Sequence, residues 1–210
     1  NDAIGMWPRG GKRIMSFKAK DSLSDQIAQH LANQIIRGDM LAGDRIQELR
    51  IAAELEVSRG SVREALLILQ RRHLIDILPR RGAVVKELSE GQVRSLYETL
   101  QVLLGLVVRK AIKVMQDDDL DRFIGLVHDT QQALDARDSE AFFAGSFVFF
   151  ETLYPFARNP YVESILVNLQ PALQRTYYMA LHLDQEEMKE CLSFFKALIE
   201  TVFQRDIRSA

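Results

Sequence analysis

The segment 46–72 constrains the fold most, because it encodes two short helices separated by a tight turn. Three apolar residues are spaced to line one face of the first helix: Ile46, Ile51 and Leu55. Ser58 is a good N-cap for the second helix. The apolar stripe of that second helix is Val62, Ala65, Leu66 and Leu69. Two short helices joined by three or four residues predict a helix-turn-helix.

A helix is expected before this segment and a hairpin after it. The first helix begins at Ser22, with Asp25 as its capping partner, and Gly38 ends it. After the helix-turn-helix, segments 74–78 and 83–85 are rich in β-branched residues and flank the turn 79–82. This order of elements predicts a winged helix over residues 21–88.

The chain after Leu88 carries only helical patterns. Ser89 and Gln92 form a capping box, which places the predicted domain boundary just before them. Further helical segments are expected at about 139–154, 160–180 and 185–205, with Pro155, Pro160 and Pro171 as boundaries or kinks. The fold class is therefore mainly α, with an antiparallel all-helical bundle over 89–210.

Charge is distributed unevenly between these two parts. Residues 1–88 carry 15 Lys and Arg against 11 Asp and Glu, whereas residues 89–210 carry 12 against 18. Residues 1–20 read as a basic arm. A polyanion is therefore expected to bind residues 1–88 rather than residues 89–210.

Cysteine content and hydropathy exclude several classes. The single cysteine excludes a disulfide scaffold and multi-cysteine metal sites. No apolar run approaches the ~18 residues of a membrane span, so we expect a cytoplasmic protein without a membrane partner. Cys191 has no histidine partner or glycine-rich turn nearby in the sequence, and no paired-carboxylate or phosphate-loop pattern occurs, so no catalytic residue and no enzyme activity are expected.

The residues expected to touch DNA lie at the start of the second helix and in the hairpin turn. Arg59 and Arg63 are four residues apart, so both project from one helical face toward base edges or phosphates. Arg80 and Arg81 are placed at a hairpin tip that can reach the neighbouring groove. Two hydroxyl residues complete this set: Ser58 and Ser61.

The motifs VSR, VREAL and RRG stand at separations that resemble the GntR family of bacterial transcription regulators, over about residues 23–88. The helices that follow are similar to the ligand-sensing FCD domain of its FadR type. The resemblance implies a homodimer on a palindromic double-stranded operator and a helical domain that binds a small metabolite, often a carboxylate. It carries over six residues as DNA-binding: Ser58, Arg59, Ser61, Arg63, Arg81 and Gly82.

Three departures from the family pattern affect this DNA-binding region. Leu49 stands where an arginine usually contacts DNA. Glu56 replaces a small turn residue, and Gly60-Ser61 replaces Thr-Pro. The operator sequence of better-known relatives is therefore not expected to apply.

The family's metal ligands are absent from the aligned positions. These positions fall on Ser146, Phe150 and Phe195, so we expect no metal and no cofactor. Effector-anchoring positions likewise fall on Leu100 and Leu104. The expected helical segment 139–154 carries an aromatic stripe: Phe143, Phe147, Phe150 and Tyr154.

Two alternatives follow for the helical domain: its pocket is filled by its own side chains, or it takes an apolar ligand such as a fatty or aromatic acid. The candidate pocket residues are Leu100, Leu104, Phe147, Phe150, Arg175, Tyr178, His182, Phe195 and Lys196, with Tyr177 as a further polar candidate. We therefore expect a repressor-type regulator with a metabolite sensor, or the same DNA-binding dimer with a helical domain that serves only dimerisation.

Overall fold

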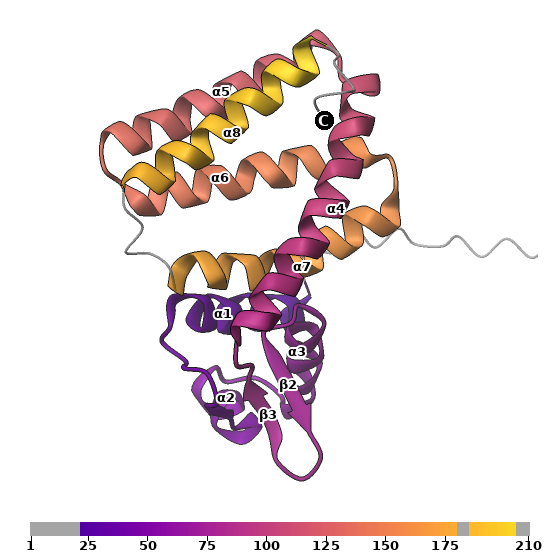
Figure 1. Cartoon of the computed structure of the whole chain (residues 1–210). Helices are drawn as coiled ribbons and strands as arrows, with labels where there is room; N and C mark the ends of the chain where they lie inside the picture. The colour runs from indigo at the N-terminus through magenta and orange to yellow at the C-terminus, as the bar shows by residue number, and fades with distance from the viewer. Residues whose placement is uncertain (1–21, 180–184, 205–210) are drawn as a thin grey trace, which may run out of the picture.

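The computed structural model describes residues 22–179 and 185–204 in two parts, a small winged helix and a larger helical bundle (Figure 1). The predicted basic arm 1–20 and the candidate His182 lie outside the described residues. The winged helix consists of α1 (Leu23–Arg37), β1 (Arg45–Ile46), α2 (Glu48–Glu54), α3 (Arg59–Arg71), β2 (Ile75–Leu78) and β3 (Gly82–Val85). The bundle consists of α4 (Glu90–Val114), α5 (Asp117–Asp135), α6 (Ser139–Leu153), the 3-10 helix η1 (Tyr154–Ala157), α7 (Pro160–Met179) and α8 (Gln185–Phe203).

Helix α1 has the limits that its sequence predicts. The Ser22 hydroxyl accepts a hydrogen bond from the Asp25 amide at 3.1 Å, and the Asp25 carboxylate accepts one from the Ser22 amide. Gly38 ends the helix with a φ of +82°, a left-handed conformation that favours glycine. The apolar face of α1 is buried against α3, which builds the core of the winged helix.

The prediction that Ile46 begins a helical face is wrong. Ile46 lies in β1, which pairs antiparallel with β3, opposite Ala83. The sheet order is β1-β3-β2, so β3 is its central strand. A two-residue strand is too short to produce an alternating pattern, and the spacing from Ile46 to Ile51 therefore resembled a helical repeat.

The turn between α2 and α3 and the tip of the hairpin both contain residues with positive φ. Glu56 adopts a φ of +53° between the two helices. Arg80 and Gly82 adopt φ values of +63° and +76° where the chain reverses between β2 and β3. The predicted helix-turn-helix and hairpin are both present.

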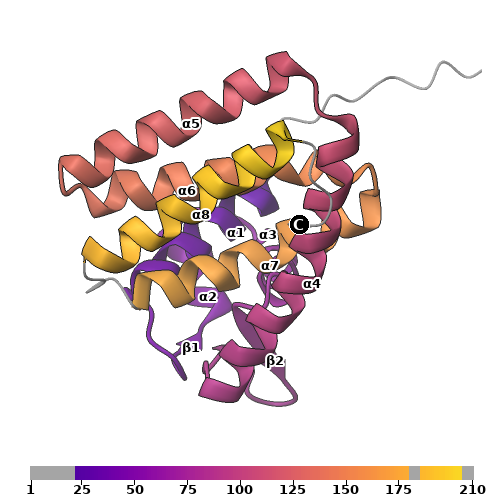
Figure 2. The same cartoon turned by 45° about the horizontal axis from the view of Figure 1, so that its top comes forward.

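The described part of the bundle consists of helices and the short connections between them, as predicted. Helix α4 begins at the Ser89–Gln92 capping box and runs for 25 residues, from the winged helix to the far end of the bundle (Figure 1). Pro155 and Pro160 lie at element boundaries, whereas Pro171 lies inside α7. Helices α5, α6 and α8 lie beside one another on one side of the bundle (Figure 2). No helix in the described part of the chain is both long and apolar enough to cross a membrane.

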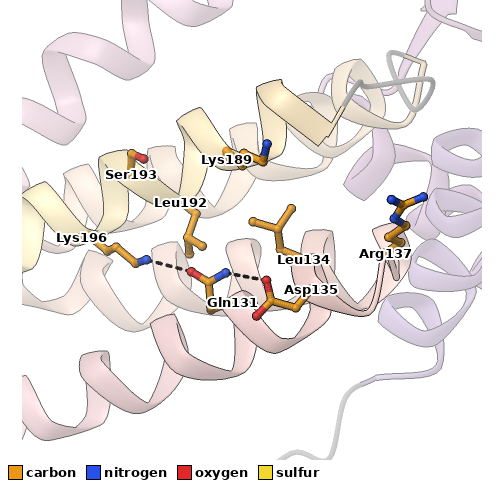
Figure 3. A pocket seen from close by; sticks show the side chains of 8 residues that line it. All are labelled: Gln131, Leu134, Asp135, Arg137, Lys189, Leu192, Ser193 and Lys196. Carbon is orange, nitrogen blue, oxygen red and sulfur yellow. Dashed lines mark hydrogen bonds between the residues drawn. The ribbon is translucent and has the colours of Figure 1, made fainter.

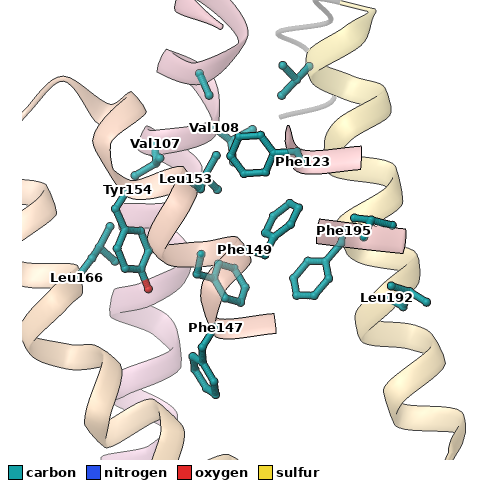
Figure 4. Packing of buried hydrophobic residues seen from close by; sticks show 14 of the residues in the cluster. Val107, Val108, Phe123, Phe147, Phe149, Leu153, Tyr154, Leu166, Leu192 and Phe195 are labelled. Carbon is teal, nitrogen blue, oxygen red and sulfur yellow. The ribbon is translucent and has the colours of Figure 1, made fainter. Parts of the chain in front are cut away.

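Aromatic rings fill the centre of the bundle (Figure 4). Phe149 stacks on Phe195, with ring centroids 4.4 Å apart, and packs edge-on against Phe123 at 5.1 Å. The aromatic stripe of α6 is buried along its length. Edge-to-face and offset ring pairs of this kind stabilise a core beyond the area they bury. The winged helix has a separate buried cluster, so each part has its own core.

Candidate nucleic-acid interface and bundle cavities

The start of α3 is organised by two serines. The Ser58 hydroxyl accepts a hydrogen bond from the Ser61 amide at 3.0 Å and lies 2.9 Å from the Ser61 hydroxyl. This N-cap satisfies one of the free amide groups of the first turn. Arg59, the first residue of the helix, is exposed. Ser61 therefore supports the helix start in place of the proline that the family pattern contains.

Arg63 is exposed on α3 but is not free. Its Nη2 donates to Glu48 Oε2 of α2 at 3.0 Å, and 65% of its side chain is accessible to solvent. The pair joins the two helices of the helix-turn-helix and holds the guanidinium on the outer face. Sequence reasoning missed Glu48, because a contact across 15 residues leaves no periodic signal. Beside it, Leu49 is 63% exposed, so α2 presents an apolar side chain at this face.

The hairpin carries the other predicted DNA contacts. Arg80, Arg81 and Gly82 are exposed at its tip, which projects away from the bundle (Figure 1). Among the residues that the structure describes, neither arginine forms an ion pair. Cationic side chains on the recognition helix and the wing are therefore all accessible, which is the arrangement that winged-helix proteins use on a duplex. By contrast, Arg72 at the end of α3 donates to Gln29 of α1 at 3.1 Å.

Side chains without metal-binding groups occupy most of the positions where the family holds a metal. Ser146 donates to the Phe142 carbonyl at 2.8 Å, and Phe150 packs against Phe195 with ring centroids 5.4 Å apart. Within the described ranges, no group of three His, Cys, Asp or Glu residues is placed to hold a metal ion. Nearby, burial raises the pKa of the Cys191 thiol to about 11, which keeps it protonated at neutral pH.

A cavity of about 680 Å³, here called the bundle cavity, lies among α4, α6, α7 and α8. Its apolar lining includes three of the predicted pocket residues: Leu100, Leu104 and Phe150. Tyr177 also lines it, and Arg94 and Thr201 are among its polar residues. The volume is in the range of small-molecule sites, and the lining suits an apolar ligand.

The remaining pocket candidates are dispersed. Phe195 is fully buried in the aromatic core. Lys196 lies in a polar groove of about 480 Å³ between α5 and α8, and it donates to Gln131 at 2.8 Å (Figure 3). In the same groove, Gln131 donates to Asp135 (Figure 3). Lys196 is thus separate from the bundle cavity.

Three more candidates lie where the bundle meets the winged helix. Arg175 is 3% exposed and donates to the Lys86 carbonyl at 2.5 Å, beyond the lining of the bundle cavity. Burial lowers the pKa of its guanidinium. Tyr178 donates to Glu140 at 3.3 Å, and it and Phe147 line a cleft between the two parts. The candidates therefore occupy four separate places: the bundle cavity, the aromatic core, the polar groove and the junction of the two parts.

Both parts of the chain match known protein families. Residues 23–85 match the family described as "Bacterial regulatory proteins, gntR family", and residues 95–210 match the FCD domain. The gluconate operon transcriptional repressor of Bacillus subtilis is 27% identical over 172 residues, which cover 82% of this chain and 70% of the relative. The transcriptional repressor RspR of Escherichia coli is 27% identical over 179 residues, covering 84% and 78%.

Solved structures share the same architecture. Escherichia coli McbR/YncC superposes with a TM-score of 0.71 at 23% identity, over 90% of each chain. A GntR regulator from Rhodococcus superposes with a TM-score of 0.66 at 20% identity, over 87% of this chain and 90% of the other. At these identities, the likeness establishes the fold.

Proposed function

Because the chain belongs to the GntR family of bacterial regulatory proteins, with an FCD domain behind its winged helix, we propose that it is a homodimeric repressor with a palindromic operator. The chain is a DNA-binding transcription regulator. Two relatives that match most of its length are named as transcriptional repressors, which supports repression rather than activation.

The observation that carries the proposal is the exposed row of cations on α3 and the wing. Arg59 and Arg63 lie one helical turn apart at the capped start of α3, and Arg80 and Arg81 extend from the hairpin. We infer that α3 enters the major groove, where an arginine recognises the O6 and N7 atoms of guanine. The wing would then contact the backbone or the adjacent minor groove.

We also propose that the bundle cavity takes an apolar effector. Leu100, Leu104 and Phe150 offer no charged anchor, so an aliphatic or aromatic body would supply most of the binding free energy. A carboxylate on such a ligand would lie at the polar edge of the cavity beside Arg94. The second candidate is a helical domain that serves only dimerisation, which the dense aromatic packing next to the cavity favours.

Selection of bound fragments from genomic DNA tests the regulator directly. We expect enrichment of a sequence with two inverted half-sites about one helical turn apart. Recovery of fragments with no shared sequence would contradict sequence-specific binding. A thermal-shift screen of fatty and aromatic acids then separates the two roles of the bundle, because a ligand of the native state must raise Tm. If no acid in the screen raises Tm, the result would favour a helical domain that serves only dimerisation.

A further inference from the structure

The two parts of the molecule meet around a second hollow, distinct from the bundle cavity. This cleft has a volume of about 560 Å³, and residues of α1, α6 and α7 line it. We propose that it binds a zwitterionic amino acid with a large apolar side chain. The cleft is assigned to a ligand because residues of three helices line it, and because its phenylalanines are buried whereas its charged residues are exposed.

Each helix contributes residues of matching spacing. Asn33, Ile36 and Arg37 lie three and four positions apart on α1, so they share one helical face. On α7, the lining residues have the same spacing: Gln174, Tyr177 and Tyr178. Helices α1 and α7 pack side by side in both views (Figures 1 and 2). The cleft walls therefore come from both the winged helix and the bundle.

The floor of the cleft is aromatic. Tyr177 packs edge-on against Phe143 at 5.5 Å and against Phe147 at 5.7 Å between ring centroids. All three rings line the cleft. A large aliphatic or aromatic side chain would be desolvated against this floor, and a site of this volume accommodates a small molecule.

The rim carries charges of both signs. Arg37 forms no ion pair or side-chain hydrogen bond within the described residues, so its guanidinium is available to a carboxylate. On the α6 side of the cleft, Glu140 already accepts a hydrogen bond from Tyr178, and Asp138 caps α6 by accepting from the Ala141 amide. These carboxylates suit an ammonium group. An amino acid matches both sides, whereas a simple anion would meet two carboxylates of like charge.

A ligand in the cleft would tie α1 to α6 and α7. Tyr177 also lines the bundle cavity, so the two hollows share this residue. Occupancy of the cleft would restrict how the winged helix is oriented on the bundle. A change in DNA binding caused by this restriction rests on the proposed function, whereas ligand binding itself does not.

Isothermal titration calorimetry of the full chain with L-phenylalanine and L-leucine tests the site. 2-Phenylethylamine and 3-phenylpropionate each lack one of the two charged groups, and we expect each to bind at least about tenfold more weakly than L-phenylalanine. Arg37→Gln and Glu140→Gln should weaken L-phenylalanine by a similar factor. Ala144→Leu narrows the cleft and should abolish binding, since Ala144 lines it and is exposed there.

Two control variants locate the ligand. Lys110→Gln changes an exposed cation on α4 and should leave binding unchanged. Leu104→Trp fills the bundle cavity and shows which hollow holds the ligand. Loss of binding in Leu104→Trp with retention in Ala144→Leu would move the ligand to the bundle and overturn the proposal. Absence of binding by both amino acids up to about 10 mM would overturn it as well. Operator binding by the ligand-free protein is measured in parallel, so failure of the DNA-binding role is seen separately.

Discussion

Arg63 combines exposure with a fixed orientation, which is what base recognition requires. Its guanidinium is directed by Glu48 at 3.0 Å rather than left to rotate in solvent. We expect Arg63→Ala to reduce operator affinity by about 1–3 kcal/mol, the cost of losing a specific arginine contact. Fluorescence anisotropy with the selected operator measures this loss of affinity. Arg122→Ala, which removes an exposed arginine from α5, should leave affinity unchanged.

Glu48 acts through Arg63, so its substitution should change specificity more than affinity. In Glu48→Gln the guanidinium loses the negative charge that it pairs with, while the loss of a negative charge near the phosphates favours binding to any duplex. We expect the ratio of operator to random-duplex affinity to fall by up to about fivefold, because an exposed ion pair contributes at most about 1 kcal/mol. An unchanged ratio would show that the pair has no positioning role.

Cys191 should be unreactive in the folded protein. Burial raises the pKa of its thiol to about 11, so at pH 8 little thiolate is present, whereas an unfolded thiol titrates near its usual value. We expect alkylation by iodoacetamide at pH 8 to be at least about 100-fold slower in the native than in the urea-unfolded state. The same shift makes the folded state lose stability as pH rises above about 8.5, the unfolded pKa. Equal rates in the two states would contradict the burial of this thiol.

Single residues could be assigned from sequence where their role is local. The N-cap of Ser58 and the outward position of Arg59 follow from helical spacing alone, and both are observed. The role of Arg175 could not be predicted in this way. Helix α7 is covered by the bundle on one side and by α1 on another, and helical spacing does not tell which partner a polar side chain meets. Its contact with the Lys86 carbonyl spans 89 residues.

Helices α5 and α6 pack closely together at Gly145. A Cβ atom built there would lie 2.8 Å from the Thr130 hydroxyl oxygen, which itself donates to the Leu126 carbonyl. Gly145→Ala should therefore lower the free energy of unfolding by about 1–3 kcal/mol, the usual cost of overpacking. Urea denaturation followed by circular dichroism measures the change.

A matched glycine provides the control for this close approach. Gly125 on α5 has no atom within 4 Å of an added Cβ, so Gly125→Ala should be neutral or stabilising, since alanine favours a helix more than glycine does. Thr130→Ala in the Gly145→Ala background should recover part of the loss. A similar cost for both glycines would mean that helix propensity, rather than packing, sets the result.

Elements with a sustained pattern were predicted well, and elements without one were not. Helices α6, α7 and α8 end within two residues of their predicted limits, because their apolar stripes are long. Strand β1 was missed because two residues carry no period, and its partner β3 lies about forty positions along the chain. A pocket filled by its own side chains was one of two alternatives for the helical domain, and Phe150 does pack on Phe195. The bundle cavity beside this pair depends on four helices meeting, which the sequence does not show.

The two parts of the chain are joined through α7 as well as through the linker before α4. Arg175 is buried at this junction and donates to Lys86 in that linker. Arg175→Ala should lower the free energy of unfolding by about 1–3 kcal/mol, because it removes a hydrogen bond and leaves a carbonyl without that partner. Urea titration measures the loss. Lys110→Ala on the exposed face of α4 should change stability by less than about 0.5 kcal/mol, and a comparable loss there would contradict a specific role for the junction.

Repression by a dimer requires that two winged helices act together on one duplex. Each copy presents a single α3 and a single wing, so one copy can read only half of an inverted repeat. In the proposed dimer, binding of the second half-site becomes effectively intramolecular once the first half-site is bound. We therefore expect a duplex with one half-site to bind at least about 100-fold more weakly than the full palindrome. Insertion of five base pairs between the half-sites, which rotates them by about half a helical turn, should weaken binding as strongly. Native mass spectrometry should give two chains per palindrome; equal affinity for half and full sites, or one chain per duplex, would contradict cooperative binding by a dimer.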